Sequence, residues 1–157
     1  MNRLNKQIAT QQPTVLLVAE ESTERARLQA ILQEANCRVL LCARGRDALE
    51  MVEFASVVIC EAPLPDCSWH DILHGTQESE RPPSVIVTSR QTSGSLWSEA
   101  LNLGAFDVLA QPICAEETLR VVRSAHRQYT LPGASGFSNS PAELKSRTSA
   151  HAFWIDQ

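Results

Sequence analysis

The sequence predicts an α/β protein with a five-stranded parallel sheet and five helices, doubly wound so that helices cover both faces. Short apolar segments rich in β-branched residues alternate with amphipathic stretches along most of the chain, which is typical of βα units. Several of these segments are continuously apolar, as expected for parallel strands covered on both sides. The predicted strands are Val15–Val18, Val39–Cys42, Val57–Cys60, Val85–Val87 and Phe106–Leu109.

The predicted helices lie between these strands. Ser22 is a good N-cap residue, and the apolar stripe of Leu28, Ile31, Leu32 and Ala35 follows it at helical spacing. The other predicted helices are Asp47–Phe54, a shorter one around His70–His74, one with the stripe Leu96, Ala100 and Leu103 that ends at Gly104, and a last one with Glu116 and Glu117 early and Arg120, Arg123 and Arg127 late. The helix dipole and solvation explain the basic patch that these arginines form with His126.

Length and composition predict one folded domain. The chain has 157 residues, of which 43% are hydrophobic and 20% charged, enough for one core and too little for two. We expect a polar extension over residues 1–13, the folded domain over residues 14–128, and a tail rich in serine, glycine and proline over residues 129–157. The tail is predicted to be disordered, with Ala152–Trp154 as a candidate docking peptide.

Charge and cysteine content exclude several classes of protein. A net charge of -4 and an isoelectric point near 5.6 argue against direct nucleic-acid binding. The apolar segments are too short to span a membrane. Five scattered cysteines without a C-x-x-C pair predict free thiols in a reducing compartment, and hence a cytoplasmic protein.

Candidate functional residues follow the predicted strands, because ligands of open parallel sheets gather at the carboxyl ends of the strands. We expect Glu20 and Glu61 to approach each other, with a hydroxyl and an amide nearby. Carboxylates clustered in this way require that one of them has a raised pKa, or that a cation, an arginine or water compensates the charge. The residues at this edge are Ala19, Glu20, Glu21, Glu61, Thr88 and Gln111.

Five segments, in this order and spacing, give the chain a family resemblance. They are VLLVAEES at the first strand, GRDALE on the second helix, VVICEAPLPD at the third strand, PSVIVTS at the fourth, and ALNLGAFDVLAQP around the fifth. Over roughly residues 14 to 127 the chain resembles a response-regulator receiver domain, which implies a flavodoxin-like fold and a role in two-component signal transduction. In this family an acidic pair binds Mg²⁺, an aspartate is phosphorylated, and a threonine or serine and a lysine contact the phosphoryl group.

The resemblance assigns a role to each residue at the predicted edge. Only Thr88, at the position of the switch hydroxyl, keeps the family's residue type. The acidic pair corresponds to Ala19 and Glu20, with Glu21 next to them, the phosphoacceptor to Glu61, the lysine to Gln111, the aromatic switch residue to Val108, and a glycine after the third-strand loop to Trp69. The resemblance therefore implies a degenerate phosphorylation site.

The substitutions favour a receiver without a phosphorylation cycle. Ala19 removes an oxygen ligand that Mg²⁺ requires, the longer side chain of Glu61 displaces an acyl phosphate from its pocket, and Gln111 carries no charge to neutralise a phosphoryl oxygen. We expect a protein-interaction module that is not an enzyme and needs no cofactor. The expected partners are a histidine kinase or another regulator, with a possible homodimer through the last helices. The expected contact surface is the last helix with the fourth, helped by Trp97.

Two other functions stay open. The chain could be a Mg²⁺-dependent phosphoryl-accepting receiver that uses Glu61, with weak Mg²⁺ binding at Glu20 and Glu61. It could instead be a metal or redox sensor, in which Cys60, Cys67, His70 and His74 provide the ligands.

Overall fold

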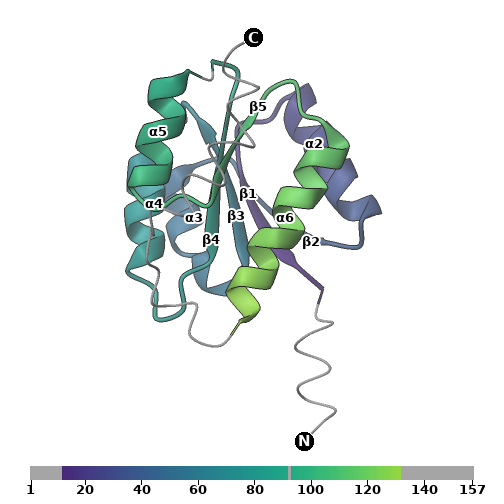
Figure 1. The fold of residues 1–157 in the computed structure, drawn as a ribbon, viewed down its shortest axis with the longest axis horizontal. Helices are drawn as coiled ribbons and strands as arrows, with labels where there is room; N and C mark the ends of the chain where they lie inside the picture. The colour runs from purple at the N-terminus through teal and green to yellow at the C-terminus, as the bar shows by residue number, and fades with distance from the viewer. Residues whose placement is uncertain (1–11, 92, 132–157) are drawn as a thin grey trace, which may run out of the picture.

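All strands of the sheet are parallel and pair in the order β2-β1-β3-β4-β5 (Figure 1). The computed structural model describes residues 12–91 and 93–131. The strands are β1 (Thr14–Val18), β2 (Arg38–Cys42), β3 (Val57–Ala62), β4 (Ser84–Ser89) and β5 (Asp107–Ala110). This topology confirms the predicted fold class, and each predicted strand agrees with the observed one to within two residues at either end.

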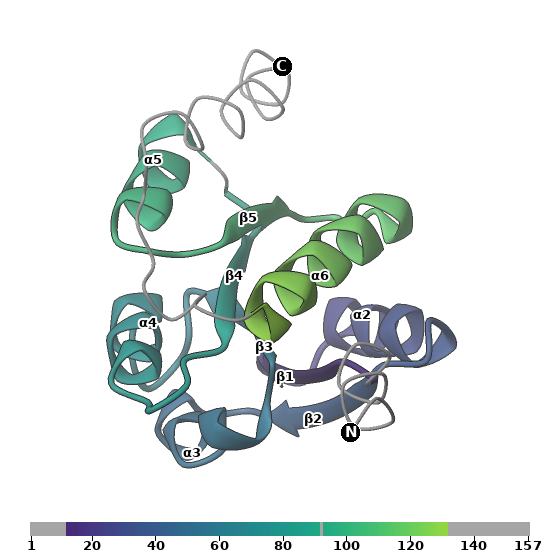
Figure 2. The ribbon, with the colours of Figure 1, turned by 60° about the horizontal axis from the view of Figure 1, so that its bottom comes forward.

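Helices cover both faces of the sheet, as Figures 1 and 2 show. On one face lie α2 (Thr23–Glu34) and α6 (Ala115–Thr130), and on the other lie α3 (Gly45–Leu49), α4 (Trp69–Gln77) and α5 (Gly94–Asn102). The central strands β1 and β3 are therefore buried on both sides, which explains why their sequences are continuously apolar.

Two predicted helix ends are confirmed. The Ser22 side chain accepts a hydrogen bond of 3.1 Å from the backbone N–H of Arg25, and thereby caps α2. Gly104 follows the end of α5 with a φ of 110°, in the region that residues other than glycine rarely adopt.

The prediction of one continuous helix over Asp47–Phe54 is wrong. The structure has the short helix α3 followed by a separate 3-10 turn, η1, over Val52–Phe54. The N–H of Met51 bonds the carbonyl of Ala48 at 2.8 Å, three residues back, and this tighter spacing ends the α-helix. Ala48 and Val52 are still buried, so the apolar stripe was assigned correctly although the helix was not.

The stripe predicted for α5 is also partly wrong. Trp97, Ala100 and Leu101 are buried, whereas Leu103 is 47% exposed because the helix ends at Asn102 and the chain then turns through Gly104. Burial of Trp97 has a consequence for function. This side chain packs in the core and does not contribute to an exposed contact surface, contrary to our expectation.

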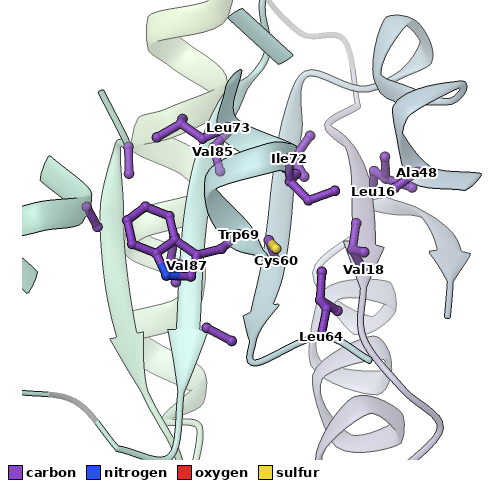
Figure 3. Packing of buried hydrophobic residues seen from close by; sticks show 14 of the residues in the cluster. Leu16, Val18, Ala48, Cys60, Leu64, Trp69, Ile72, Leu73, Val85 and Val87 are labelled. Carbon is purple, nitrogen blue, oxygen red and sulfur yellow. The ribbon is translucent and has the colours of Figure 1, made fainter. Parts of the chain in front are cut away.

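The buried side chains form two clusters, one on each face of the sheet. Figure 3 shows part of the cluster under α3, α4 and α5, which includes Trp69 and Ile72 of α4 together with Cys60 and Val87 of the sheet. The cluster under α2 and α6 contains alternate residues of the same strands, such as Leu17 and Ile59. The sheet thus lies between the two clusters, and its strands contribute side chains to both.

Helix α6 continues to Thr130, two residues beyond the predicted domain boundary. The predictions for residues 1–11 and for most of the tail, including Ala152–Trp154, lie outside the described residues. In the part of the chain that the structure describes, no helix is long and apolar enough to cross a membrane.

All five cysteines are free, and Cys37, Cys42 and Cys60 are buried, as expected for small apolar side chains.

Candidate functional site at the carboxyl edge of the sheet

The topology brings the predicted residues of β3, β4 and β5 to one edge. Glu61 pairs in register with Thr88 on the neighbouring strand. Side chains alternate along a strand, so Glu61 lies on the same face as Ile59, which is the face that α2 and α6 cover. Thr88 lies on the same face as Ile86 by the same rule. The third-strand carboxylate and the fourth-strand hydroxyl are therefore neighbours, as predicted.

Gln111 and Thr88 are in direct contact. The Gln111 amide Nε2 donates a long hydrogen bond of 3.4 Å to Thr88 Oγ1, and Thr88 is only 2% exposed. The Gln111 amide oxygen is buried and has no hydrogen-bond partner within the described residues. The NH2 group of the Gln111 amide is thus hydrogen-bonded to Thr88, whereas the amide oxygen is unsatisfied within the described residues.

A residue of α2 fixes the loop that carries Gln111. Glu24 lies in the first turn of α2, and its Oε2 accepts a hydrogen bond of 3.3 Å from the backbone N–H of Ile113. This bond joins the start of α2 to the segment between β5 and α6. The same helix holds the end of β1, because Arg25 Nη1 donates a bond of 3.3 Å to the carbonyl of Ala19.

The three residues after β1 have different environments. Ala19 is 2% exposed and packs in the apolar cluster under α2 and α6, together with Leu28 and Ile113. Glu20 and Glu21 are exposed to solvent. The position that the resemblance assigns to one of two acidic residues therefore holds a buried methyl group.

Glu61 is half-buried in an unfavourable electrostatic environment. Burial raises the pKa of its carboxyl above the ordinary value of 4.5, because it penalises the charged form. The Arg90 guanidinium lowers this pKa, while the carboxylates of Glu20 and Glu24 raise it. Burial and the two carboxylates outweigh the arginine, so the net shift is upward.

Arg90 and Glu24 complete the site but were not predicted as members of it. The sequence left open which group compensates the clustered carboxylates, and the structure identifies Arg90, which directly follows β4. Its position after a strand end was a usable signal. Glu24 lies in the first turn of α2, four residues after Glu20, and the second carboxylate that acts on Glu61 is Glu24 where we expected Glu21.

The other two positions assigned by the resemblance are part of the core. Val108 is buried on β5, in the same cluster as Trp69 and Trp97. Trp69 begins α4, is buried, and stacks its ring on that of His70 at 3.8 Å between centroids. Trp69 therefore belongs to the core and does not present its ring at the surface.

The loop after β3 is joined to the start of α3. The Asp66 carboxylate accepts hydrogen bonds from the backbone N–H groups of Gly45 at 2.9 Å and Arg46 at 3.1 Å, and these bonds lower the pKa of Asp66 below its ordinary value of 3.8. The next residue, Cys67, lies so close to Gly45 that a Cβ atom there would clash with its Sγ.

The four candidate metal or redox ligands do not form one site. His70 pairs with Glu99 of α5 at 2.7 Å, and His74 pairs with Glu78 at 3.3 Å. Cys60 is fully buried, and burial raises the pKa of its thiol far above the ordinary value of 9.0. Over residues 12–91 and 93–131, no three histidine, cysteine or acidic side chains are arranged to hold a metal ion.

Comparisons with known proteins agree on one family. Residues 15–123 match the family model described as the response regulator receiver domain. The chain is 30% identical over 115 residues to the two-component response regulator ORR5 of Oryza sativa subsp. japonica, an alignment that covers 69% of this chain and 85% of that protein. It is 32% identical over 120 residues to the transcriptional regulatory protein KdpE of Mycobacterium tuberculosis, covering 74% of this chain and 53% of KdpE.

The fold comparison gives the same answer. The signal receiver domain of a protein described as a Luxo repressor from Vibrio parahaemolyticus superimposes with a TM-score of 0.70 at 26% identity. This match covers 75% of the present chain and 92% of that domain.

Proposed function

This chain belongs to the response regulator receiver family, whose members act in two-component signalling, and we propose that it is a pseudo-receiver. A pseudo-receiver keeps the receiver fold but has no phosphorylation cycle. Its role is to bind signalling proteins through a surface that needs no phosphoryl group. On this proposal the domain is not an enzyme, since it neither transfers a phosphoryl group to itself nor removes one.

The observation that carries the proposal is the pair of contacts around Thr88 and Ala19. The position that the family gives to a lysine holds the uncharged amide of Gln111, which donates a hydrogen bond to the Thr88 hydroxyl. The position of one acidic residue is a methyl group packed in the core. Both features remove charge from places where phosphoryl transfer develops it, and such transfer depends on positioning and electrostatic stabilisation.

The residues present do not fit the Mg²⁺ ion that receivers use. Mg²⁺ requires a near-octahedral set of oxygen ligands. Ala19 is buried in the apolar cluster and supplies no side-chain oxygen, so one of the two acidic groups that the family uses is missing. Glu20 remains as an exposed carboxylate, which is at most a weak ligand on its own.

The proposed binding surface consists of α6 together with α5, which flank β5 on opposite faces of the sheet (Figure 2). Two side-chain contacts join α5 to α4 and support a fixed shape for this side. His70 pairs with Glu99, and Gln77 Nε2 donates a bond of 2.9 Å to the carbonyl of Leu103. We propose a histidine kinase, another regulator or a second copy of the chain as the class of partner.

A second function deserves a test because of one observation. Arg90 places a positive charge within electrostatic reach of Glu61, and a guanidinium could partly replace the family's lysine. This arrangement favours the alternative in which Glu61 accepts a phosphoryl group.

One titration separates the two functions. We expect the amide NMR spectrum of the full chain to be unchanged at Glu61, Thr88 and Gln111 when Mg²⁺ and then beryllofluoride, a phosphoryl mimic, are added. Shifts at these residues that spread to α5 and α6 would contradict the proposal and support phosphorylation at Glu61.

A variant with the family's residues restored is the matched control. Glu61→Asp combined with Gln111→Lys returns a short acceptor and an ammonium group to the edge, and Ala19→Asp added to these returns the second carboxylate. We expect beryllofluoride shifts in the triple variant, with its fold checked by far-UV circular dichroism. A response there and none in the natural chain would show that the three substitutions, rather than the scaffold, abolish the chemistry.

A further inference from the structure

Three arginines form a row along the exposed face of α6. Arg120, Arg123 and Arg127 are all exposed, and steps of three and four residues return to the same face of a helix. The row is about 10 Å long at 1.5 Å per residue. We call Arg120, Arg123 and Arg127 the arginine row.

The helix dipole does not account for the arginine row. Dipole effects are confined to the last turn of a helix, and Arg127 is the basic residue of the last turn of α6. Arg120 and Arg123 lie in the middle of the helix. Of the two explanations given from sequence, the dipole applies to Arg127 alone, and solvation remains for Arg120 and Arg123.

The arginine row also differs in sign from the rest of the domain. The described residues carry ten arginines, no lysine and sixteen acidic residues, which leaves a net charge of −6. Within these residues the ion pairs at 4.0 Å or less involve Arg27, His70 and His74. The three guanidinium groups of the row thus have no ion-pair partner in the described domain.

The chain's own ends do not complement the row in charge. Residues 1–11 contain Arg3 and Lys6 and no acidic residue, and residues 132–157 contain two basic and two acidic residues. Neither segment contains a run of carboxylates that would match the three arginines.

We propose that the arginine row binds an acidic helix of a partner protein, whose carboxylates recur at the same three- and four-residue spacing. An arginine holds a carboxylate through two parallel hydrogen bonds, which gives geometric selectivity that lysine lacks. Leu131, 54% exposed and one turn beyond Arg127, adds an apolar contact at one end. This inference rests on the proposed function in taking α6 as the binding surface.

Nucleic acid fits the row less well than a protein helix does. A duplex presents a long track of phosphates, and the domain's net charge of −6 repels such a polyanion. Glu116 and Glu117 begin the same helix and limit the positive stretch to about two turns. A short row of carboxylates matches this length.

The test uses a synthetic alanine-based helical peptide with glutamates at positions i, i+4 and i+7, and a matched peptide with glutamines there. In amide NMR spectra of the full chain, we expect the glutamate peptide to shift residues 120–127, and the glutamine peptide to leave them unchanged. The affinity should fall about tenfold in Arg120→Gln/Arg123→Gln/Arg127→Gln, because three exposed ion pairs are lost.

A charge-matched variant controls for net charge. Arg27→Gln/Arg44→Gln/Arg46→Gln removes three exposed arginines elsewhere and should bind the glutamate peptide as the natural chain does, with both variants checked for fold by circular dichroism. Equal losses in the two variants would overturn the inference. Shifts centred outside α6, or tighter binding of a short DNA duplex to the same residues, would also overturn it.

The experiment separates this inference from the proposed function. If the glutamate peptide binds the row only after Mg²⁺ and beryllofluoride are added, the arginine row is supported and phosphorylation independence fails. If it binds equally with and without them, both are supported.

Discussion

The charged form of Glu61 is disfavoured by the surroundings of its carboxyl in the folded protein. Its carboxyl is partly buried beside two other carboxylates and has one nearby arginine. The charged form is therefore less favourable in the folded protein than in the unfolded chain. A group of this kind reduces stability at neutral pH, and the reduction disappears when the carboxyl is protonated.

Replacing Glu61 with glutamine should make the protein more stable at pH 7. The raised pKa means that the natural chain loses stability as the pH rises from the ordinary value of 4.5 through the raised value, and the variant has no such loss. Urea unfolding at pH 7 and at pH 4 measures both free energies. We expect a gain at pH 7 that shrinks at pH 4. Glu21→Gln, an exposed control, should show no such difference, and equal behaviour of the two variants would contradict the argument.

Removing Arg90 should raise the pKa of Glu61 further. The Arg90 guanidinium is the group that lowers this pKa, so Arg90→Gln leaves burial and the two carboxylates unopposed. The side-chain carboxyl carbon of Glu61 in ¹³C NMR reports the pKa directly. Arg44→Gln removes an exposed arginine between β2 and α3 and serves as the control. An unchanged Glu61 pKa in Arg90→Gln would show that the arginine does not compensate the site.

At the scale of single residues, the sequence predicted which strand ends meet but not all of their neighbours. Glu61, Thr88 and Gln111 were found because they directly follow apolar strands. Glu24 lies inside a helix, and its bond to the N–H of Ile113 joins residues 89 positions apart, which no local pattern encodes.

Among the elements, α3 depends most on a distant part of the chain. It has five residues and no cap from its own N-cap residue, Arg44. Asp66 provides the missing acceptors for its first N–H groups, and Cys67 fills the space beside Gly45. The loop that follows Glu61 and Pro63 is therefore part of the support of α3.

Adding a methyl group at Gly45 should destabilise this junction. Gly45→Ala brings a Cβ against Cys67 Sγ and close to Ile72, and overpacking of this kind costs roughly 1–3 kcal/mol. Chemical unfolding measures the loss. In Gly45→Ala/Cys67→Ala the thiol is absent, so most of the loss should be recovered. Equal losses in Gly45→Ala with and without Cys67 would show that the clash is not its cause.

The elements were predictable where local signals agree. Ser22 and the stripe of α2 indicated one helix, and Gly104 indicated the end of another. Over residues 45–54 the apolar spacing was correct, but the break at Met51 results from a shift to three-residue hydrogen bonding that leaves the spacing of Ala48 and Val52 unchanged. A pattern based on apolar spacing alone does not detect such a break.

At the scale of the whole molecule, two buried clusters share one sheet. Leu16 belongs to the cluster under α3, α4 and α5, and its neighbour Leu17 belongs to the cluster under α2 and α6. Neither cluster can lose its packing without disturbing the strands that support the other. The alternation of elements predicted a parallel, doubly wound sheet, whereas the flavodoxin-like topology was implied only by the family resemblance.

Truncation on either face should therefore weaken the whole domain. Leu16→Ala and Leu17→Ala each remove a fully buried side chain and should cost about 2–5 kcal/mol. Trp69 and Trp97 both lie in the cluster with Leu16, so tryptophan fluorescence measured in a Trp154→Phe background reports one face, while far-UV circular dichroism reports all helices. The two signals should give the same urea midpoint in both variants. Separate midpoints in Leu17→Ala would mean that the faces unfold independently.

The absence of lysine from the described domain has a practical consequence for chemistry at its surface. The chain has two lysines, Lys6 and Lys145, and both lie outside residues 12–91 and 93–131. Reagents that acylate side-chain amines therefore leave every helix and strand described above unmodified. The chain can be tethered to a sensor surface or labelled with a dye through these two positions. The arginine row and the site around Glu61 then stay chemically intact.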